Sequence, residues 1–346
     1  MVDLSLTPAL LPGDRLPNFQ RHDADDRPVV FYDVYCGRPV LLVIVLDPQT
    51  GSLAGAINAA READVSVIWM IDGTPTDAAR FRDEFSPPGQ VIADDGQIID
   101  FLFGGTRPDS ALVTFSLDAN ARIIGRWLDW SDSALASWPA DDPGRLVTRT
   151  APVLVIPRVF EPDFCRHLID VYQSDNEPSG VLKLVEGRMV YQTDDDTKIR
   201  REHRIEETGL RQAVEKRLLR RVLPEIEWAF NFKVTRYEAF KIVCYDASTG
   251  GHFRAHRDNN GVDTAHRRFA LTLNLNSDDY SGGELRFPEY GPDRYKPPTG
   301  GAVVFSCSLA HEALRVEQGA RYALVSFFYG DRDHHQQVQY ENRVRA

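Results

Sequence analysis

The stretch that decides the fold runs from Lys241 to Gly330. It reads KIVCYDASTGGHFRAHRDNN at 241–260, LTLNLNSDDYSGGELRFPEYG at 271–291 and GGAVVFSCSLAHEALRVEQGARYALVSFFYG at 300–330. Short apolar runs alternate there with turn residues such as Gly, Asn and Asp, a pattern typical of antiparallel strands. This stretch therefore predicts a β-structure that carries several polar side chains on its strands.

Three of those polar residues form a candidate metal site. His256 and Asp258 are two positions apart, so on one strand their side chains point to the same face. His311 follows 53 residues after Asp258 and is expected to arrive from a later strand. Two imidazoles and one carboxylate leave open positions on a bound metal, which is the ligand set of non-haem Fe(II) oxygenases.

Arg321 opens the alternating strand RYALVSFF ten residues after His311. A buried arginine is costly unless it meets an anion, and its fork of donors suits a carboxylate. These motifs resemble the 2-oxoglutarate/Fe(II)-dependent oxygenase superfamily, in particular its prolyl 4-hydroxylase-like branch. The resemblance rests on Tyr245, HRD at 256–258, GGELRFPEYG at 282–291, GGAVVF at 300–305 and HEALRVEQGARYALVSFF at 311–328.

The resemblance implies a double-stranded β-helix (jelly roll) with supporting helices, in which His256, Asp258 and His311 hold Fe(II). It implies that Arg321 and Tyr245 bind the co-substrate 2-oxoglutarate. Asn274 stands where prolyl hydroxylases often have a tyrosine, and its amide is expected to reach the same carboxylate. The implied reaction uses O2 to hydroxylate an unactivated C–H bond, with release of succinate and CO2.

The resemblance leaves the substrate open between a peptide or protein of the prolyl type and a small molecule. It also leaves open whether L-ascorbate serves as a reductant. The charged segment 194–204 is expected to be a solvated loop, and its cations could meet an acidic substrate. His203, His252, His266 and the pair His334–His335 are expected not to be metal ligands.

A charge asymmetry divides the chain. The net charge is −11, and residues 1–150 contribute 22 acidic side chains against 12 basic ones, whereas residues 151–346 are nearly balanced. We expect a first domain at 1–138, a linker at 139–150 and the oxygenase domain at 151–346. An acidic first domain would repel phosphate, so nucleic acid is not expected as a partner.

The first domain reads as alternating strands and helices. Buried strands are predicted at 39–46 and 65–71, and helices at 52–63 and 77–85, which together predict an α/β sandwich. The segments that carry a further resemblance are PGDRLPNF at 12–19, GRPVLLVIVLDPQTG at 37–51 and SLDANARIIGRW at 116–127. They resemble the peroxiredoxin branch of the thioredoxin-like fold.

The residue that peroxiredoxins need is missing. Their reactive cysteine follows the first core strand, but the segment 47–53 (DPQTGSL) contains none, and Cys36 precedes the strand. We therefore expect a non-catalytic domain that serves homodimerisation or partner docking. Two alternatives remain: a thiol peroxidase that uses this domain, and a non-catalytic metal-binding or scaffold protein with a degenerate oxygenase barrel.

The sequence also predicts the cellular location of the protein and the helices and strands of the second domain. No apolar run of membrane-spanning length and no signal peptide is evident, and the four cysteines are scattered, so a cytoplasmic protein without membrane contact is predicted. A helix is expected at 210–231, kinked or divided at Pro224. A short pair of strands is predicted at 182–192, and further strands are predicted at 240–245, 252–258, 269–276, 284–287, 302–306, 313–316 and 322–329.

Overall fold

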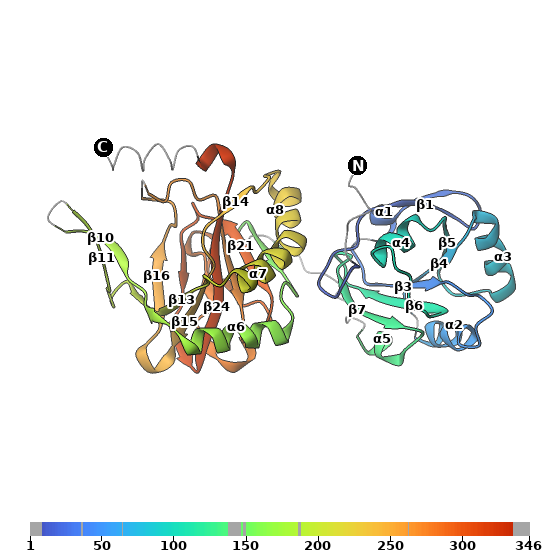
Figure 1. Cartoon of the computed structure of the whole chain (residues 1–346), viewed down its shortest axis with the longest axis horizontal. Coiled ribbons are helices and arrows are strands. Elements are labelled where there is room, and N and C mark those ends of the chain that lie inside the picture. Colours follow the sequence, from blue (N-terminus) through green and yellow to red (C-terminus); the bar gives the residue numbers. More distant parts are fainter. Residues whose placement is uncertain are drawn as a thin grey trace. The chain divides into compact units, whose positions relative to one another are not determined.

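A computed structural model describes residues 9–35, 37–63, 65–137, 147, 150–185, 188–261 and 263–334. The chain forms two compact units, Met1–Arg145 (unit 1) and Leu146–Ala346 (unit 2), each with its own hydrophobic core (Figure 1). Most of the expected linker at 139–150, Cys36 and His335 lie outside the described residues. None of the described helices is both long and apolar enough to cross a membrane.

Unit 1 is built on one mixed sheet. Its strand order, within the described residues, is β2-β1-β5-β4-β3-β6-β7. The three central strands β3, β4 and β5 are parallel, and the outer strands pair antiparallel. The strands are β1 (Gln20–Asp23), β2 (Pro28–Val30), β3 (Val40–Val45), β4 (Val67–Asp72), β5 (Gln90–Asp94), β6 (Leu112–Leu117) and β7 (Ile123–Leu128).

Helices cover both faces of this sheet. Alternate residues of β3 enter different cores: Leu42 packs with α1 and α4, whereas Leu41 packs with α2, α3 and α5. Burial on both faces explains why the strand is a continuous apolar run. The helices are α1 (Phe31–Tyr35), α2 (Leu53–Glu62), α3 (Pro75–Phe85), α4 (Gln97–Leu102) and α5 (Asp132–Ala136). The predicted α/β sandwich is confirmed, although the short strands β1, β2 and β5 were not predicted.

Unit 2 contains two larger antiparallel sheets. Within the described residues, the first has the order β8-β21-β17-β24-β15-β13-β9, with β14 also on β24, and the second has the order β12-β16-β22-β19-β20. The first comprises β8 (Val153–Ile156), β9 (Glu177–Pro178), β13 (Arg201–Arg204), β14 (Arg236–Tyr237), β15 (Lys241–Asp246), β17 (Phe269–Asn274), β21 (Ala302–Ser306) and β24 (Ala320–Tyr329). The second comprises β12 (Lys198–Ile199), β16 (His252–His256), β19 (Leu285–Arg286), β20 (Arg294–Tyr295) and β22 (His311–Ala313). Two further pairs are β10 (Val181–Val185) with β11 (Arg188–Gln192) and β18 (Ser281–Gly282) with β23 (Val316–Gln318).

Three helices cover one face of the larger sheet (Figure 1): α6 (Pro162–Ser174), α7 (Thr208–Arg221) and α8 (Leu223–Phe230). Leu218 of α7 shares a core with Ile242 and Leu324 of that sheet. The predicted division of the long helix is confirmed, because Pro224 lies in the first turn of α8. Proline lacks the N–H that a continuous helix would need there.

Two predictions about unit 2 are wrong. The segment 194–204 is not a solvated loop, because β12 pairs with β16 and β13 pairs with β15, which buries Lys198 and Glu202. A single strand at 313–316 is also wrong, because the chain leaves β22 at Ala313 and enters β23 only at Val316. In addition, β16 ends at His256, so Asp258 lies beyond the strand on which its orientation was predicted.

Candidate metal centre

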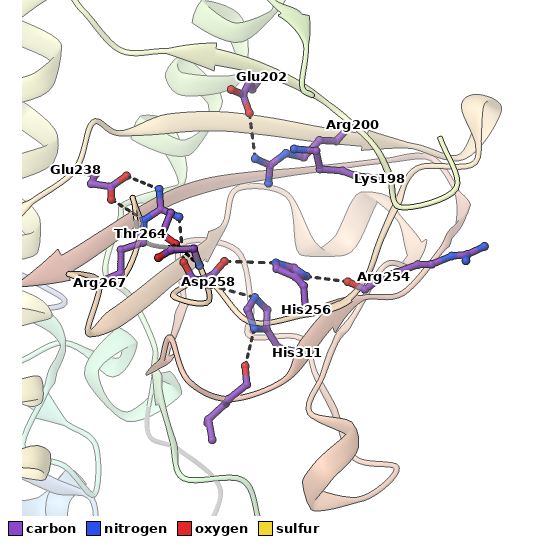
Figure 2. Close-up of polar contacts among 12 residues, drawn as sticks. Lys198, Arg200, Glu202, Glu238, Arg254, His256, Asp258, Thr264, Arg267 and His311 are labelled. Atoms are coloured by element: carbon purple, nitrogen blue, oxygen red, sulfur yellow. Dashed lines mark hydrogen bonds and ion pairs between the residues drawn. The ribbon is translucent and has the colours of Figure 1, made fainter. Parts of the chain in front are cut away.

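The structure brings His256, Asp258 and His311 together. His256 ends β16, His311 begins β22, and the two residues are direct partners in the pairing of these strands. Asp258 Oδ1 lies 3.4 Å from His256 Nε2, and Asp258 Oδ2 lies 3.3 Å from His311 Nε2 (Figure 2). One ligand atom from each residue lies within 4.8 Å of the others, and no second such cluster occurs among the described residues.

Both imidazoles are oriented by backbone carbonyls. His256 Nδ1 lies 2.7 Å from the Arg254 carbonyl oxygen, and His311 Nδ1 lies 3.0 Å from that of Leu309. A carbonyl only accepts, so each Nδ1 carries a proton, and each Nε2, which faces Asp258, is the ring nitrogen available to a metal ion. A metal ion placed between these two Nε2 atoms and the carboxylate would accept an electron pair from all three residues. The donor set therefore fits a divalent metal ion.

The protonation states of Asp258 and His311 also fit the binding of a divalent metal ion. Burial alone would raise the pKa of Asp258, but His311 and His256 hold it below its usual range. Burial lowers the pKa of His311, although Asp258 partly opposes that shift. At neutral pH the site thus presents an ionised carboxylate and an uncharged His311, and metal binding requires both forms.

Sequence reasoning missed the residues that hold Asp258 in place. Arg267 Nη1 donates to the Asp258 carbonyl oxygen at 3.3 Å, and its other nitrogens form a two-point ion pair with Glu238 at 2.6 and 2.9 Å. Burial would raise the pKa of Glu238, and hydrogen bonds from His266 and Arg267 lower it overall. Glu238 lies outside the quoted motifs, so no spacing rule identifies this pair.

Aromatic rings fix the two histidines from behind. Phe253 stacks on His256 with a centroid distance of 3.6 Å, and Phe305 lies 4.5 Å from His311. Such packing locks the side-chain rotamers of the ligands. The imidazole positions are therefore set before any ion arrives.

The three candidate ligands line a cavity of about 500 Å³ that also contains Tyr245, Thr272 and Arg321. Only 3% of Arg321 is exposed. Its Nη1 donates to the Gly283 carbonyl at 2.7 Å, its Nη2 donates to Thr272 Oγ1 at 3.1 Å, and its Nε has no hydrogen-bond partner among the described residues. A buried guanidinium with neutral partners is prepared for an anion.

Tyr245 and Asn274, the other two residues predicted to bind 2-oxoglutarate, differ in their position relative to the cavity. Tyr245 is buried in the cavity wall, and its hydroxyl oxygen accepts from Arg200 Nη1 at 3.3 Å. Asn274 does not line the cavity, because its Nδ2 donates to the Pro297 carbonyl at 3.1 Å. Its Oδ1 lies 3.4 Å from Arg321 Nη2, so Asn274 supports that arginine rather than facing a ligand.

The remaining described histidines stay outside the cluster. His252 Nδ1 bonds to the Gly250 carbonyl, His203 Nδ1 bonds to that of Asp175, and His266 Nε2 bonds to Glu238. None of them joins a group of metal-ligating side chains within the described ranges. The predicted selection of His256 and His311 thus matches the geometry.

Comparisons with known proteins agree with the site. Residues 240–329 match the family model described as the 2OG-Fe(II) oxygenase superfamily, so the predicted resemblance is confirmed for this region. A PKHD-type hydroxylase of Pseudomonas fluorescens is 35% identical over 94 residues, which are 25% of this chain and 40% of that relative. The chain thus spans less than half of that relative's length.

Two solved structures are similar to different parts of the chain. A prolyl-4-hydroxylase of Pseudomonas putida is 18% identical, with a TM-score of 0.39, over 52% of this chain and 93% of that protein. The peroxidoxin BcpB of Mycobacterium tuberculosis, which resembles the N-terminal part, is 18% identical, with a TM-score of 0.31. The match covers 37% of this chain and 96% of the peroxidoxin chain.

Proposed function

We propose that unit 2 is an Fe(II)- and 2-oxoglutarate-dependent oxygenase that hydroxylates a C–H bond of its substrate. The observation that carries this proposal is the convergence of His256, Asp258 and His311 in one cavity with the buried Arg321. The two antiparallel sheets would be the walls of a double-stranded β-helix. Three buried, unpaired cysteines fit a reducing, cytoplasmic location: Cys165, Cys244 and Cys307.

Different residues of unit 2 would hold the metal ion and bind the co-substrate. His256 Nε2, His311 Nε2 and the Asp258 carboxylate would hold the ion, and Arg267 would keep the Asp258 backbone in place. Arg321 and Thr272 would bind the distal carboxylate of 2-oxoglutarate. Bound ferrous iron would supply the activation of O2, by which 2-oxoglutarate, O2 and a C–H bond become succinate, CO2 and an alcohol.

Tyr245 and the aromatic side chains of the cavity wall would lie beside the groups that bind the ion and the co-substrate. Tyr245 lies between the two cationic sides of the cavity, with its ring 5.5 Å from Arg321 Cζ and its hydroxyl beside Arg200. Phe253 and Phe305 cover the imidazoles and keep bulk water from their outer faces. A dry site strengthens the charge interactions on which the ion and the co-substrate depend.

The decisive assay measures succinate. The full chain is mixed with Fe(II), 2-oxoglutarate and ascorbate under air, and succinate is quantified by mass spectrometry without an added substrate. We expect slow succinate formation that is lost in His256→Ala and retained in His252→Ala, the matched control on the same strand. A wild-type protein that binds the metal but forms no succinate would contradict the proposal.

A further inference from the structure

A second group of cations lines the same cavity as Arg321. It consists of Lys198, Arg200 and Lys241, and two of these, Arg200 and Lys241, pair with the carboxylate of Glu202. Glu202 Oε2 accepts from Arg200 Nη2 at 3.0 Å and from Ser179 Oγ at 2.6 Å, while Oε1 accepts from Lys241. Arg200 and Lys241 therefore share one carboxylate.

Lys198 is the least compensated of the three cations. Only 6% of it is exposed, and its ammonium donates to the neutral carbonyl oxygen of Gly180. No carboxylate pairs with it in the part of the chain that the structure describes. Burial, with a contribution from Arg200, lowers the pKa of Lys198 to about 7. An isolated buried charge of this kind is unfavourable unless a counter-ion joins it.

These cations lie beside the metal ligands. Lys198 Nζ is 5.1 Å and Arg200 Cζ is 5.6 Å from the centre of the Phe253 ring, which itself stacks on His256. In Figure 2 both side chains lie near Glu202, above His256 in the view. An anion bound by these cations would thus lie near the ring that stacks on His256.

The co-substrate does not account for this second group. Under the proposed function, the distal carboxylate of 2-oxoglutarate lies at Arg321 and its other end lies at the metal, which leaves the charges around Glu202 unchanged. Each remaining cation in the cavity wall has a carboxylate of its own, since Arg257 pairs with Glu289 and Arg267 pairs with Glu238. The excess positive charge is therefore local to Lys198, Arg200 and Lys241.

We propose that Lys198 and Arg200 bind a carboxylate of the primary substrate and so hold its neighbouring carbon atoms at the metal centre. This inference rests on the proposed function and narrows the substrate class to carboxylate-bearing compounds. The carboxylate could belong to a free amino acid or to an acidic side chain of a peptide, because both present the same group. Arg200 would supply the directional donors, and Lys198 the uncompensated charge.

The test is a binding experiment without turnover. The full chain is loaded with Mn(II) and saturating 2-oxoglutarate under argon, and calorimetry measures its affinity for two sets of probes. The first set is the L-amino acids and their α-carboxamides; the second is aspartate and glutamate with both ends capped, together with capped asparagine and glutamine. The first set represents free amino acids and the second represents protein side chains.

We expect at least one acid to bind and its amide not to bind. Lys198→Gln and Arg200→Gln should each weaken that binding by about tenfold to a hundredfold, because each removes a charged hydrogen bond. Both variants should keep the wild-type affinity for 2-oxoglutarate, which also shows that the cavity is folded. Arg201→Gln is the matched control, because the neighbouring Arg201 contacts Asn176 instead of the cavity.

Three outcomes would overturn the inference. One is that no acid of either set binds the wild-type protein, and another is that an amide binds as well as its acid. The third is that the variants weaken 2-oxoglutarate binding instead, which would assign both cations to the co-substrate. If the wild-type protein binds neither Mn(II) nor 2-oxoglutarate, the proposed function itself fails, and the inference fails with it.

Discussion

At the scale of single residues, Asp258 supplies the carboxylate of the candidate metal site, and the Nε2 atoms of both imidazoles face it. Asp258→Asn keeps the shape of the side chain but removes its negative charge. We expect Mn(II) affinity, measured by calorimetry, to fall by more than the roughly 10–100-fold that loss of an outer partner causes. Unchanged affinity would show that these three residues do not form the metal site.

Lys198 gives a prediction about pH. Its pKa is about 7 in the folded protein against an ordinary value of 10.5, so the unfolded chain binds more protons between these two values. The contribution of this lysine to stability should therefore rise as the pH rises through that window. Between pH 7 and pH 9, we expect the wild-type free energy of unfolding to gain about 2 kcal/mol relative to Lys198→Met.

Denaturant titrations of both proteins at the two pH values measure this difference. The comparison with Lys198→Met removes the contributions of all other groups, because those are common to both proteins. The same stability difference at pH 7 and pH 9 would mean that Lys198 is not desolvated in the folded state.

At the scale of elements, the turn between β15 and β16 sets the position of His256. A Cβ atom on Gly251 would lie 2.5 Å from the backbone nitrogen of Asp246 and 2.8 Å from the Cα of Tyr245. Backbone atoms cannot move aside cheaply, so Gly251→Ala should destabilise unit 2 by about 1–3 kcal/mol. It should also weaken Mn(II) binding, because β16 would shift.

Gly55 in helix α2 is the contrasting position. A Cβ atom there would meet no atom within 4 Å. Gly55→Ala should therefore stabilise unit 1 by about 0.5–1 kcal/mol, because alanine loses less backbone entropy than glycine in a helix. Calorimetric melting of the two variants measures both effects, and a destabilised Gly55→Ala would contradict this description of α2.

The elements also differ in how far the sequence predicts them. The six consecutive apolar residues of β3 are typical of a strand buried on both faces, and Pro224 marks the division between α7 and α8. Strands β12 and β13 were not predicted, because the sequence that forms them, KIRREHR at 198–204, has the composition of a solvated loop. Their burial depends on pairing with β15 and β16, some 40 to 55 residues away, which local patterns do not reveal.

The residues of the candidate metal site also differ in how far the sequence predicts their positions. His256, Asp258, His311 and Arg321 stand in motifs with fixed order, so a resemblance is enough to select them. The orientation of Asp258, however, does not come from strand alternation, because β16 ends before it. The backbone contact of Asp258 with Cys307 and the hydrogen bond from Arg267 hold it, and both are products of the tertiary fold.

At the scale of the whole molecule, each hydrophobic core draws its residues from one unit only. We therefore expect two calorimetric unfolding transitions, with Gly55→Ala shifting one and Gly251→Ala the other. A fragment of residues 147–346 should keep the Mn(II) affinity of the full chain, because the candidate ligands and the residues around them all come from unit 2. A fragment that folds but binds no metal would assign unit 1 a part in the site.

The proposed function requires that the metal and 2-oxoglutarate bind in one cavity, with Arg321 on the distal carboxylate of 2-oxoglutarate. The most direct test is the affinity for 2-oxoglutarate under argon, measured with and without Mn(II), in the wild-type protein and in Arg321→Gln. We expect that Mn(II) strengthens 2-oxoglutarate binding and that 2-oxoglutarate strengthens Mn(II) binding by the same factor. We also expect that Arg321→Gln weakens 2-oxoglutarate binding while the affinity for Mn(II) alone is unchanged. Independent binding of the two ligands, or full 2-oxoglutarate affinity in Arg321→Gln, would contradict the proposed function.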